Sequence, residues 1–274
     1  MTTPMTVRTF AALVAALTLS ACGIDLETTA VQDISAPATG GRVRFFNFGI
    51  GTPSVNFYAG DRKVTAIASA TGAEATTGVA YGGVGNGGLY ATLAPGAYTF
   101  SGRIIGGVFD NGLAISTIAG TLVDGTHYSV FQSGVYDAVA KTIDGFVVTD
   151  PIPETFNFSV AYVRFVHASH NSNAMTLDAT NTVTSTVTAV GTSVAYKAAG
   201  AFVALPAGTY NVTGTCGATC NSTGAGNATT TVTRTGITLS AGRYYTIALR
   251  GDVTLNPATT TLANRLLFDF TANR

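Results

Sequence analysis

The sequence predicts an all-β protein whose body is two tandem antiparallel β-sandwich domains. The first indication is composition: the 274 residues include 32 glycines, and only 10% are charged, against about a quarter in typical soluble domains. Glycine and the β-branched residues threonine and valine disfavour helices and suit strands joined by tight turns. The second indication is that apolar and polar residues alternate in many short runs, and the third is an internal repeat.

Three blocks in the first half of the chain recur in the same order in the second half. The matching blocks are 43–57 with 163–177, 93–102 with 205–214, and 121–130 with 238–247. The opening block contains Val43-Arg44-Phe45, which reappears as Val163-Arg164-Phe165. Only the loops between blocks differ in length, which indicates a duplication of one folding unit.

Each block has the alternation of a strand with one buried face. Val43 and Phe45 alternate with Arg44, which predicts that the apolar side chains point inward and the arginine outward. Turn signals stand just before later strands, at Pro95-Gly96, Ala207-Gly208 and Ala241-Gly242. About seven or eight such runs per repeat, with no amphipathic helix between them, favour immunoglobulin-like sandwiches. Closing strands are expected at 141–147 and 264–270.

The predicted organisation has five parts. They are a signal peptide at 1–21, a lipidated cysteine and flexible tether at 22–41, the first sandwich at 42–150, a linker at 151–158 and the second sandwich at 159–274. The linker follows from Pro151 and Pro153, because each proline restricts itself and the preceding residue to extended conformations.

The first residues supply an anchor. The apolar run 10–19 has the length of a signal peptide and is too short to span a bilayer. It leads into Leu19-Ser20-Ala21-Cys22-Gly23, which resembles the lipobox of bacterial lipoproteins, whose cysteine is lipidated and becomes the mature N-terminus. An ordinary secretory signal is the alternative, and both place the protein outside the cytoplasm. The resemblance implies attachment to the membrane through Cys22, at the outer membrane where a cell has one, because Gly23 replaces the aspartate that favours inner-membrane retention.

Charge excludes one class of partner. The chain has 14 basic and 14 acidic residues and no basic run, whereas nucleic-acid binding needs clustered lysine or arginine. We therefore expect no nucleic-acid partner and no electrostatic membrane-surface site.

The repeated motifs resemble a known family. Val-Arg-Phe-Val-His-Ala-Ser at 163–169, Leu-Pro-Ala-Gly-Thr-Tyr at 205–210 and Leu-Ser-Ala-Gly-Arg-Tyr-Tyr-Thr at 239–246 are similar to the bacterial domain-of-unknown-function family numbered 4397, found in secreted and lipid-anchored proteins. The family usually has a proline and an acidic residue after the Ala-Ser, whereas His170 and Asn171 stand there. The first repeat has Asn47 in place of His167. The resemblance implies no chemistry.

Two cysteines remain when Cys22 is lipidated. Cys216 and Cys220 should pair in an oxidising compartment and staple the end of a hairpin. A metal site or free thiols are the alternatives, although a metal would need further ligands and no other cysteine or histidine lies nearby in the sequence.

The histidines offer weaker candidates. His167, His170 and Asp178 could form a metal or acid–base site. Against this, His167 continues the inward alternation of Val163 and Phe165, and its counterpart is Asn47, so we expect a hydrogen-bonded polar group at a strand end. His127 is interpreted in the same way because its counterpart is Tyr244.

Two further patterns have structural interpretations. Residues 83–88 match the Gly-x-Gly-x-x-Gly dinucleotide fingerprint, but they lead into an expected strand at 89–93 rather than a helix, which indicates a mobile loop. Arg44 and Arg164 hold equivalent positions, and we expect them to pair with the acidic residues of the closing strands, Asp144 and Asp269 respectively.

These observations favour a non-enzymatic cell-envelope lipoprotein that acts as a binding or interaction module, without a cofactor, metal site or catalytic residues. An envelope protein or a glycan is the expected partner, met by loops such as 83–88 and 216–227. One alternative is a hydrolase or carbohydrate-active enzyme that uses His167, His170 and Asp178. The other is a structural spacer or matrix component.

Overall fold

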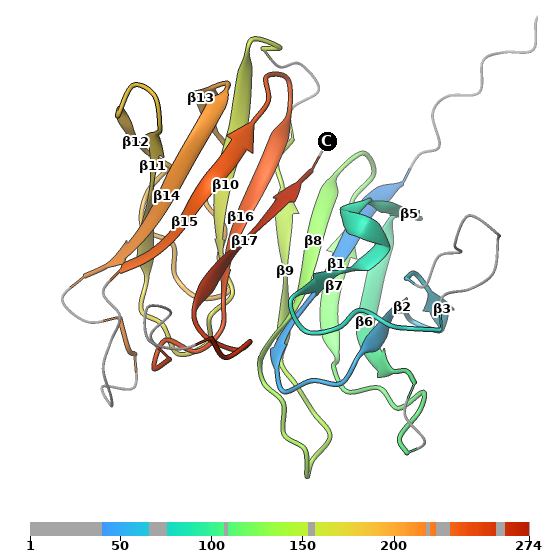
Figure 1. Cartoon of the computed structure of the whole chain (residues 1–274). Coiled ribbons are helices and arrows are strands. Elements are labelled where there is room, and N and C mark those ends of the chain that lie inside the picture. The colour runs from blue at the N-terminus through green and yellow to red at the C-terminus, as the bar shows by residue number, and fades with distance from the viewer. Residues whose placement is uncertain are drawn as a thin grey trace, which may run out of the picture. The chain divides into compact units, whose positions relative to one another are not determined.

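Each repeat folds into two sheets that face one another across a hydrophobic core (Figure 1). The computed structural model describes residues 40–65, 76–106, 109–152, 157–217, 220–222, 231–255 and 261–273. The predicted signal peptide 1–21, Cys22 and the tether up to residue 39 lie outside the described residues. Gly41, the last residue of the predicted tether, already belongs to the first strand. No helix in the described part of the chain has the length and apolarity to cross a bilayer.

In the first repeat, the inner sheet has the strand order β4-β1-β8-β9, and β5 also pairs with β1. The outer sheet has the order β3-β2-β6-β7. The elements are β1 (Gly41–Ile50), β2 (Val55–Ala59), β3 (Arg62–Lys63), β4 (Gly83–Val84), the 3-10 turn η1 (Gly85–Gly88), β5 (Ala91–Leu93), β6 (Gly96–Ile104), β7 (Ile118–Leu122), β8 (His127–Val135) and β9 (Gly145–Asp150).

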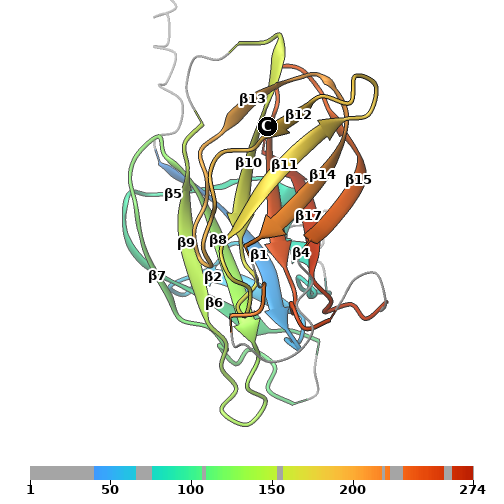
Figure 2. The ribbon, with the colours of Figure 1, turned by 90° about the vertical axis from the view of Figure 1, so that its left-hand side faces the viewer.

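The second repeat has the same topology. Its inner sheet has the order β13-β10-β16-β17 and its outer sheet the order β12-β11-β14-β15, which faces the viewer in Figure 2. The elements are β10 (Val160–His167), β11 (Met175–Asn181), β12 (Val187–Ala189), β13 (Val203–Pro206), β14 (Gly208–Cys216), β15 (Thr231–Leu239), β16 (Tyr244–Arg250) and β17 (Leu267–Ala272). The expected all-β class and the two tandem β-rich domains are therefore confirmed.

The repeated sequence blocks fall on equivalent strands in the same register. Val43 lies opposite Tyr128 in the first repeat, and Val163 lies opposite Tyr245 in the second. The hydroxyls of these tyrosines accept hydrogen bonds from the backbone N–H of Val123 and Ser240, at 3.0 Å in both repeats. The repeated tyrosine thus closes the turn before its own strand. Glycine occupies the left-handed position of the same turns because that conformation strains residues with a Cβ: φ is 70° at Gly125 and 71° at Gly242.

The prediction of purely antiparallel sheets is wrong for one strand pair in each repeat. β1 runs parallel to β8, and β10 runs parallel to β16. A parallel pair needs a long crossover, and here the strands of the outer sheet supply it, so the chain re-enters the inner sheet in its original direction. These mixed sheets do not confirm the immunoglobulin-like topology.

Both faces of each inner sheet are buried. One face packs on the outer sheet of its own repeat, through a core that includes Val43 and Phe45 in repeat 1 and Val163 and Phe165 in repeat 2. The other faces share a third core, in which the side chains of both repeats meet. Its buried members are Phe46, Phe48, Phe131, Phe146, Val166, Ala168 and Ala248. Because this core draws on both repeats, they form one packed body.

Two buried arginines lie where the inner sheets of the two repeats meet. Arg44 and Arg164 are 1% and 0% exposed, so the expectation that they point outward is wrong. Each guanidinium Nε donates to the hydroxyl opposite it on the parallel neighbour strand: Arg44 to Ser129 Oγ at 2.9 Å, and Arg164 to Thr246 Oγ1 at 3.1 Å. Arg44 Nη2 also donates to Thr246 Oγ1 at 3.1 Å, which links the first repeat to the second.

One carboxylate serves both arginines. Asp150, at the end of β9, receives Arg164 Nη2 on Oδ1, and its Oδ2 lies 3.6 Å from Arg44 Nε. Ser129 and Tyr90 donate hydroxyl hydrogen bonds to the same Oδ2. The corresponding position in repeat 2, after β17, is taken by the uncharged Asn273, whose backbone N–H bonds the carbonyl of Tyr244.

The expected partners of these arginines are also wrong. Asp144 pairs with Lys197 of the second repeat, and Asp269 pairs with Arg250. Local alternation could not show this, because the second repeat covers the polar face of the first inner sheet. The acid that both arginines use is Asp150, the last residue of β9. The closing strands span Gly145–Asp150 and Leu267–Ala272, each about three residues later than the expected 141–147 and 264–270.

Replacing Asp150 with asparagine should destabilise the whole body. Asp150→Asn keeps the shape of the side chain but leaves two buried guanidinium groups without a counter-charge, which should cost about 3–5 kcal/mol of unfolding free energy. Urea unfolding followed by circular dichroism measures this loss. Asp124→Asn is the matched control at an exposed turn and should change stability by less than about 0.5 kcal/mol. Equal effects of the two variants would contradict a structural role for the buried pairs.

Candidate functional site

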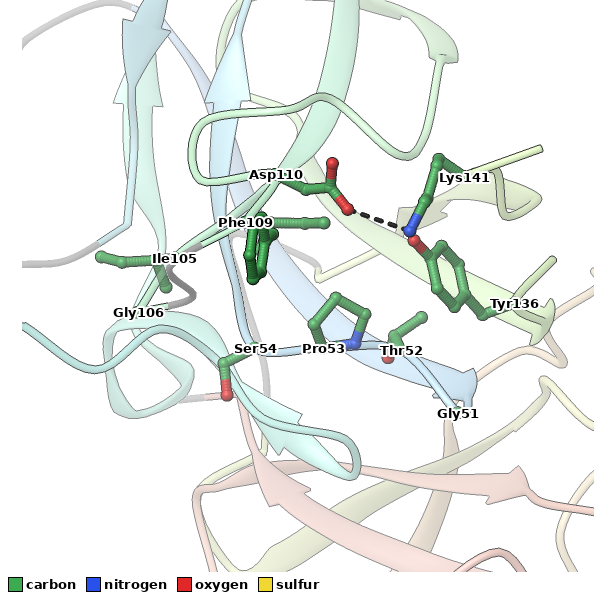
Figure 3. Close-up of a pocket in the computed structure, with 11 residues that line it drawn as sticks. Gly51, Thr52, Pro53, Ser54, Ile105, Gly106, Phe109, Asp110, Tyr136 and Lys141 are labelled. Atoms are coloured by element: carbon green, nitrogen blue, oxygen red, sulfur yellow. Dashed lines mark ion pairs between the residues drawn. The ribbon is translucent and has the colours of Figure 1, made fainter. Parts of the chain in front are cut away.

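A cavity of about 530 Å³ opens where three loops of the first repeat meet (Figure 3). The loops follow β1, β6 and β8, and they contribute Thr52 to Ser54, Phe109 and Asp110, and Tyr136 and Lys141. This volume is within the roughly 300–1,000 Å³ range of small-molecule sites. We call this cavity and its lining the repeat 1 pocket.

An ion pair bridges two of the loops. Asp110 Oδ2 lies 2.9 Å from Lys141 Nζ, and Figure 3 shows the pair on one side of the pocket, above Tyr136. The hydrogen bond and the charge of Asp110 raise the pKa of Lys141, so the ammonium form persists at neutral pH. The two charges cancel, and the lysine keeps donor capacity beyond the single contact with Asp110.

Both members of the pair have left-handed backbone conformations. Lys141 ends a tight hairpin loop in which Asp137 Oδ1 accepts the backbone N–H groups of Val139 and Ala140 at 2.8 and 2.9 Å. Its φ is 57°, where glycine or asparagine is favoured, and φ of Asp110 is 61°. Non-glycine residues in this region cost stability and cluster at functional sites. Two residues with this conformation form one ion pair at the pocket, which makes the pocket a candidate functional site.

The pocket also presents apolar surface. Phe109 is 84% exposed, although most phenylalanines of the described chain are in the cores. Pro53 and the ring of Tyr136 line the cavity beside it (Figure 3). The lining therefore mixes flat apolar surfaces with a fixed donor and acceptor.

A buried asparagine holds one wall in place. Asn47 near the end of β1 accepts a hydrogen bond from Thr52 Oγ1 on its Oδ1 at 2.9 Å and donates through Nδ2 to the carbonyl of Val79 at 2.9 Å. The loop after β1 is thus fixed from below by a residue whose side chain is fully buried. This second layer of contacts keeps the pocket geometry defined.

His167 occupies the equivalent position in repeat 2 and has a similar role. The ring is fully buried, and its Nε2 lies 3.1 Å from the carbonyl oxygen of Asn173 in the loop after β10. Burial lowers the pKa of His167 to about 4. The ring is therefore neutral at pH 7. Its Nε2 contacts the loop as expected of a polar group at a strand end, whereas its buried Nδ1 has no hydrogen-bond partner among the described residues.

The other residues of the enzymatic alternative are in different surroundings. His170 is half-buried, and burial lowers its pKa, while the neighbouring charge of Asp252 raises it by a smaller amount. Asp178 lies in β11 between Ala189 and Thr213 of the adjacent strands. Within the described residues, no group of three or more His, Cys, Asp or Glu side chains could hold a metal ion. His127 lies 3.2 Å from Arg42 Nη1 and packs edge-on against Tyr90.

Cys216 and Cys220 form a disulfide at the end of β14. The backbone N–H of Asn173 bonds the carbonyl of Cys220 at 2.7 Å, so this link also fixes the loop that His167 contacts. A loop this short contributes roughly 2 kcal/mol in the chain-entropy account of disulfide stabilisation. Residues 218, 219 and 223–227 of the expected contact loop 216–227 lie outside the described residues.

The glycine-rich run 83–88 is not the mobile loop expected. It forms β4 and η1, and β4 pairs with β1 through Phe46 with Val84 and Asn47 with Gly83. The strand that follows is Ala91–Leu93, shorter than the 89–93 expected.

A second cavity, of about 380 Å³, is lined by residues 124–127 and 150–152. Its one buried carboxylate, Asp150, already forms ion pairs with Arg44 and Arg164.

The residues that mark the repeat 1 pocket were missed by sequence reasoning. Phe109 and Asp110 stand on a loop between the repeated blocks, and Lys141 was expected to begin the closing strand 141–147, whereas it lies in the loop before β9. One signal was available: Phe109 is an aromatic residue between the glycines at 106, 107 and 112, with no alternating strand around it.

The buried imidazole should make stability depend on pH. The unfolded chain binds a proton at His167 near the ordinary pKa of 6.5, and the folded chain only near 4. The contribution of neutral His167 to the free energy of unfolding is therefore fully present above pH 6.5. It should decrease by about 3 kcal/mol as the pH falls from 6.5 to 4. In urea titrations over this range, His167→Asn should remove this part of the slope, whereas the control His127→Asn, at a half-buried site, should keep it. A slope that is the same in wild type and His167→Asn would contradict the assignment.

Comparison with known proteins identifies a family for this chain. Two segments, 41–180 and 161–267, match the family model described as "Domain of unknown function (DUF4397)". No curated protein matches the chain. A leucine-rich repeat protein from Bacteroides thetaiotaomicron VPI-5482 aligns at 14% identity over 84% of this chain, with a TM-score of 0.20, and the chain spans 27% of that protein's length. A candidate cell adhesion protein from Bacteroides eggerthii DSM 20697 aligns at 12% identity over 86% of this chain and 96% of its own, with a TM-score of 0.22.

TM-scores this low do not establish a common fold, so the family match is the informative comparison. Its two segments begin at β1 and just after the start of β10, the equivalent first strands of the two repeats. The chain belongs to the DUF4397 family, whose domains have no assigned function, and it carries two tandem copies.

Proposed function

We propose that this protein is a non-enzymatic lipoprotein of the cell envelope that binds an envelope component through the repeat 1 pocket. The observation that carries the proposal is the pocket itself, with an exposed aromatic ring beside a fixed ion pair. The binding alternative is favoured over the enzymatic one because His167, the first residue of the enzymatic set, is fully buried. Loops held on a rigid sandwich are a common place for binding sites.

The first strand of repeat 1 leads from the start of the described chain to the pocket. β1, whose course is visible in Figure 1, begins at Gly41, and the first lining residue of the pocket, Gly51, follows directly after the end of this strand. Ten residues of strand extend about 33 Å.

The anchor can be tested by a single substitution. Wild-type protein should sediment with membranes and resist extraction with high salt, because acyl chains on Cys22 bind through apolar burial rather than charge. Cys22→Ser should move the protein to the soluble fraction in immunoblots of fractionated cells. A Cys22→Ser variant that still sediments with membranes would contradict the lipid anchor.

The binding function can be tested by photo-cross-linking in cells. A photoreactive phenylalanine analogue in place of Phe109 keeps an aromatic ring at the pocket and should give a discrete adduct with an envelope component. The matched control replaces Phe158, which is 74% exposed in the segment before β10 and does not line the pocket. Adducts are detected by immunoblot as a shift in mass. Identical adducts from both positions, or none from Phe109, would refute binding at this pocket.

A further inference from the structure

We propose that the repeat 1 pocket takes one neutral sugar unit of a glycan. This inference rests on the proposed binding function and names the ligand class of that site. Three features of the lining carry it: a cancelled pair of charges, an exposed flat apolar surface, and left-handed backbone conformations at both members of the ion pair.

The charges of the pocket favour a ligand without net charge. Asp110 and Lys141 neutralise one another at 2.9 Å, so the site has no excess with which to attract an anion or a cation. An anionic group placed beside Lys141 would also approach the carboxylate of Asp110, and a cation would meet the ammonium in the same way. Sugar hydroxyls both donate and accept hydrogen bonds, and they can therefore use the lysine donors and the carboxylate acceptors together.

The apolar surface matches the C–H face of a sugar ring. Phe109 lies beside the cavity with 84% of its surface exposed, an arrangement that costs free energy unless a partner covers the ring. Pro53 adds a second flat surface close to it, and Tyr136 offers a ring with a hydroxyl (Figure 3). Aromatic rings present large flat contact areas, and a tyrosine adds a polar handle at one edge. An apolar plane bordered by donors and acceptors corresponds to a pyranose, whose carbon face is bordered by hydroxyls.

The backbone keeps these groups in place before a ligand arrives. Lys141 is held at φ 57° by a hairpin loop in which glycine or asparagine would be less strained. A lysine kept at such a position carries a cost in stability, which is consistent with a functional use of its side chain. Asn47 fixes Thr52 from below, so the facing wall is also preset.

The test uses the full chain purified in detergent and an array of neutral and acidic oligosaccharides, followed by calorimetric titration with the neutral oligosaccharides that bind. Wild type should bind neutral oligosaccharides in preference to acidic ones. Phe109→Ala and Lys141→Asn should each weaken this binding by about tenfold or more. Asparagine tolerates a positive φ, so Lys141→Asn should fold normally. Val139→Ala, at a 93% exposed residue of the same loop outside the lining, is the matched control and should bind as wild type does.

A charge substitution sharpens the test. Asp110→Asn leaves Lys141 without its counter-charge, so binding should shift toward acidic oligosaccharides at the expense of neutral ones. The sugar inference is overturned if wild type prefers acidic oligosaccharides, if it binds none, or if Phe109→Ala binds as tightly as Val139→Ala. Cross-linking from position 109 to a protease-sensitive envelope protein would overturn the sugar inference and leave the binding module standing. The absence of both glycan binding and any adduct would refute both proposals.

Discussion

The paired burial of Arg44 and Arg164 on Asp150 is the constraint on which the rest of the body depends. Two cations removed from water are costly unless they are compensated, and here one carboxylate, two hydroxyls and the carbonyl of Thr149 share that task. Ser129 and Asp150 compensate Arg44 within its own repeat, whereas Arg164 reaches its carboxylate and the Thr149 carbonyl only when the two inner sheets meet. Packing of Phe46 on Phe131, with ring centroids 4.5 Å apart, then fills the same layer with apolar surface. The polar contacts link named groups of the two sheets, and the aromatic side chains of the third core pack around them.

The strands could be predicted from the sequence because their cause is local. Apolar alternation, a turn glycine and the tyrosine that closes each turn all lie within about ten residues of one another, and their recurrence identified the duplication. The parallel pairing of β1 with β8 could not be predicted in this way, because it depends on a crossover through a different sheet. The burial of Arg44 was hidden for a similar reason. An arginine flanked by valine and phenylalanine suggests an exposed face, and only the second repeat, which is distant in the sequence, covers it.

The loop ends of the two repeats show how duplicated scaffolds diverge. Asn47 and His167 hold equivalent positions and both bind the loop that follows their strand. In the first repeat that loop lines a pocket, whereas in the second the corresponding loop is bound to a disulfide-linked turn. The pocket residues could not be predicted because they stand on three loops that are distant in the sequence and meet only in the folded repeat. Similar strand cores can thus support loop ends with different chemistry.

The presence of an aspartate at 150 and an asparagine at 273 makes the two copies unequal. An isolated second repeat would keep Arg164 without the carboxylate that neutralises it, and an isolated first repeat would expose its aromatic layer to water. A boundary that is natural in the sequence, between β9 and β10, therefore passes within ten residues of the contacts that join the halves. Because each copy matches the family model separately, one would expect each to fold as an independent domain. In this chain residues Thr39–Arg274 form one compact unit, and the two copies share its third core.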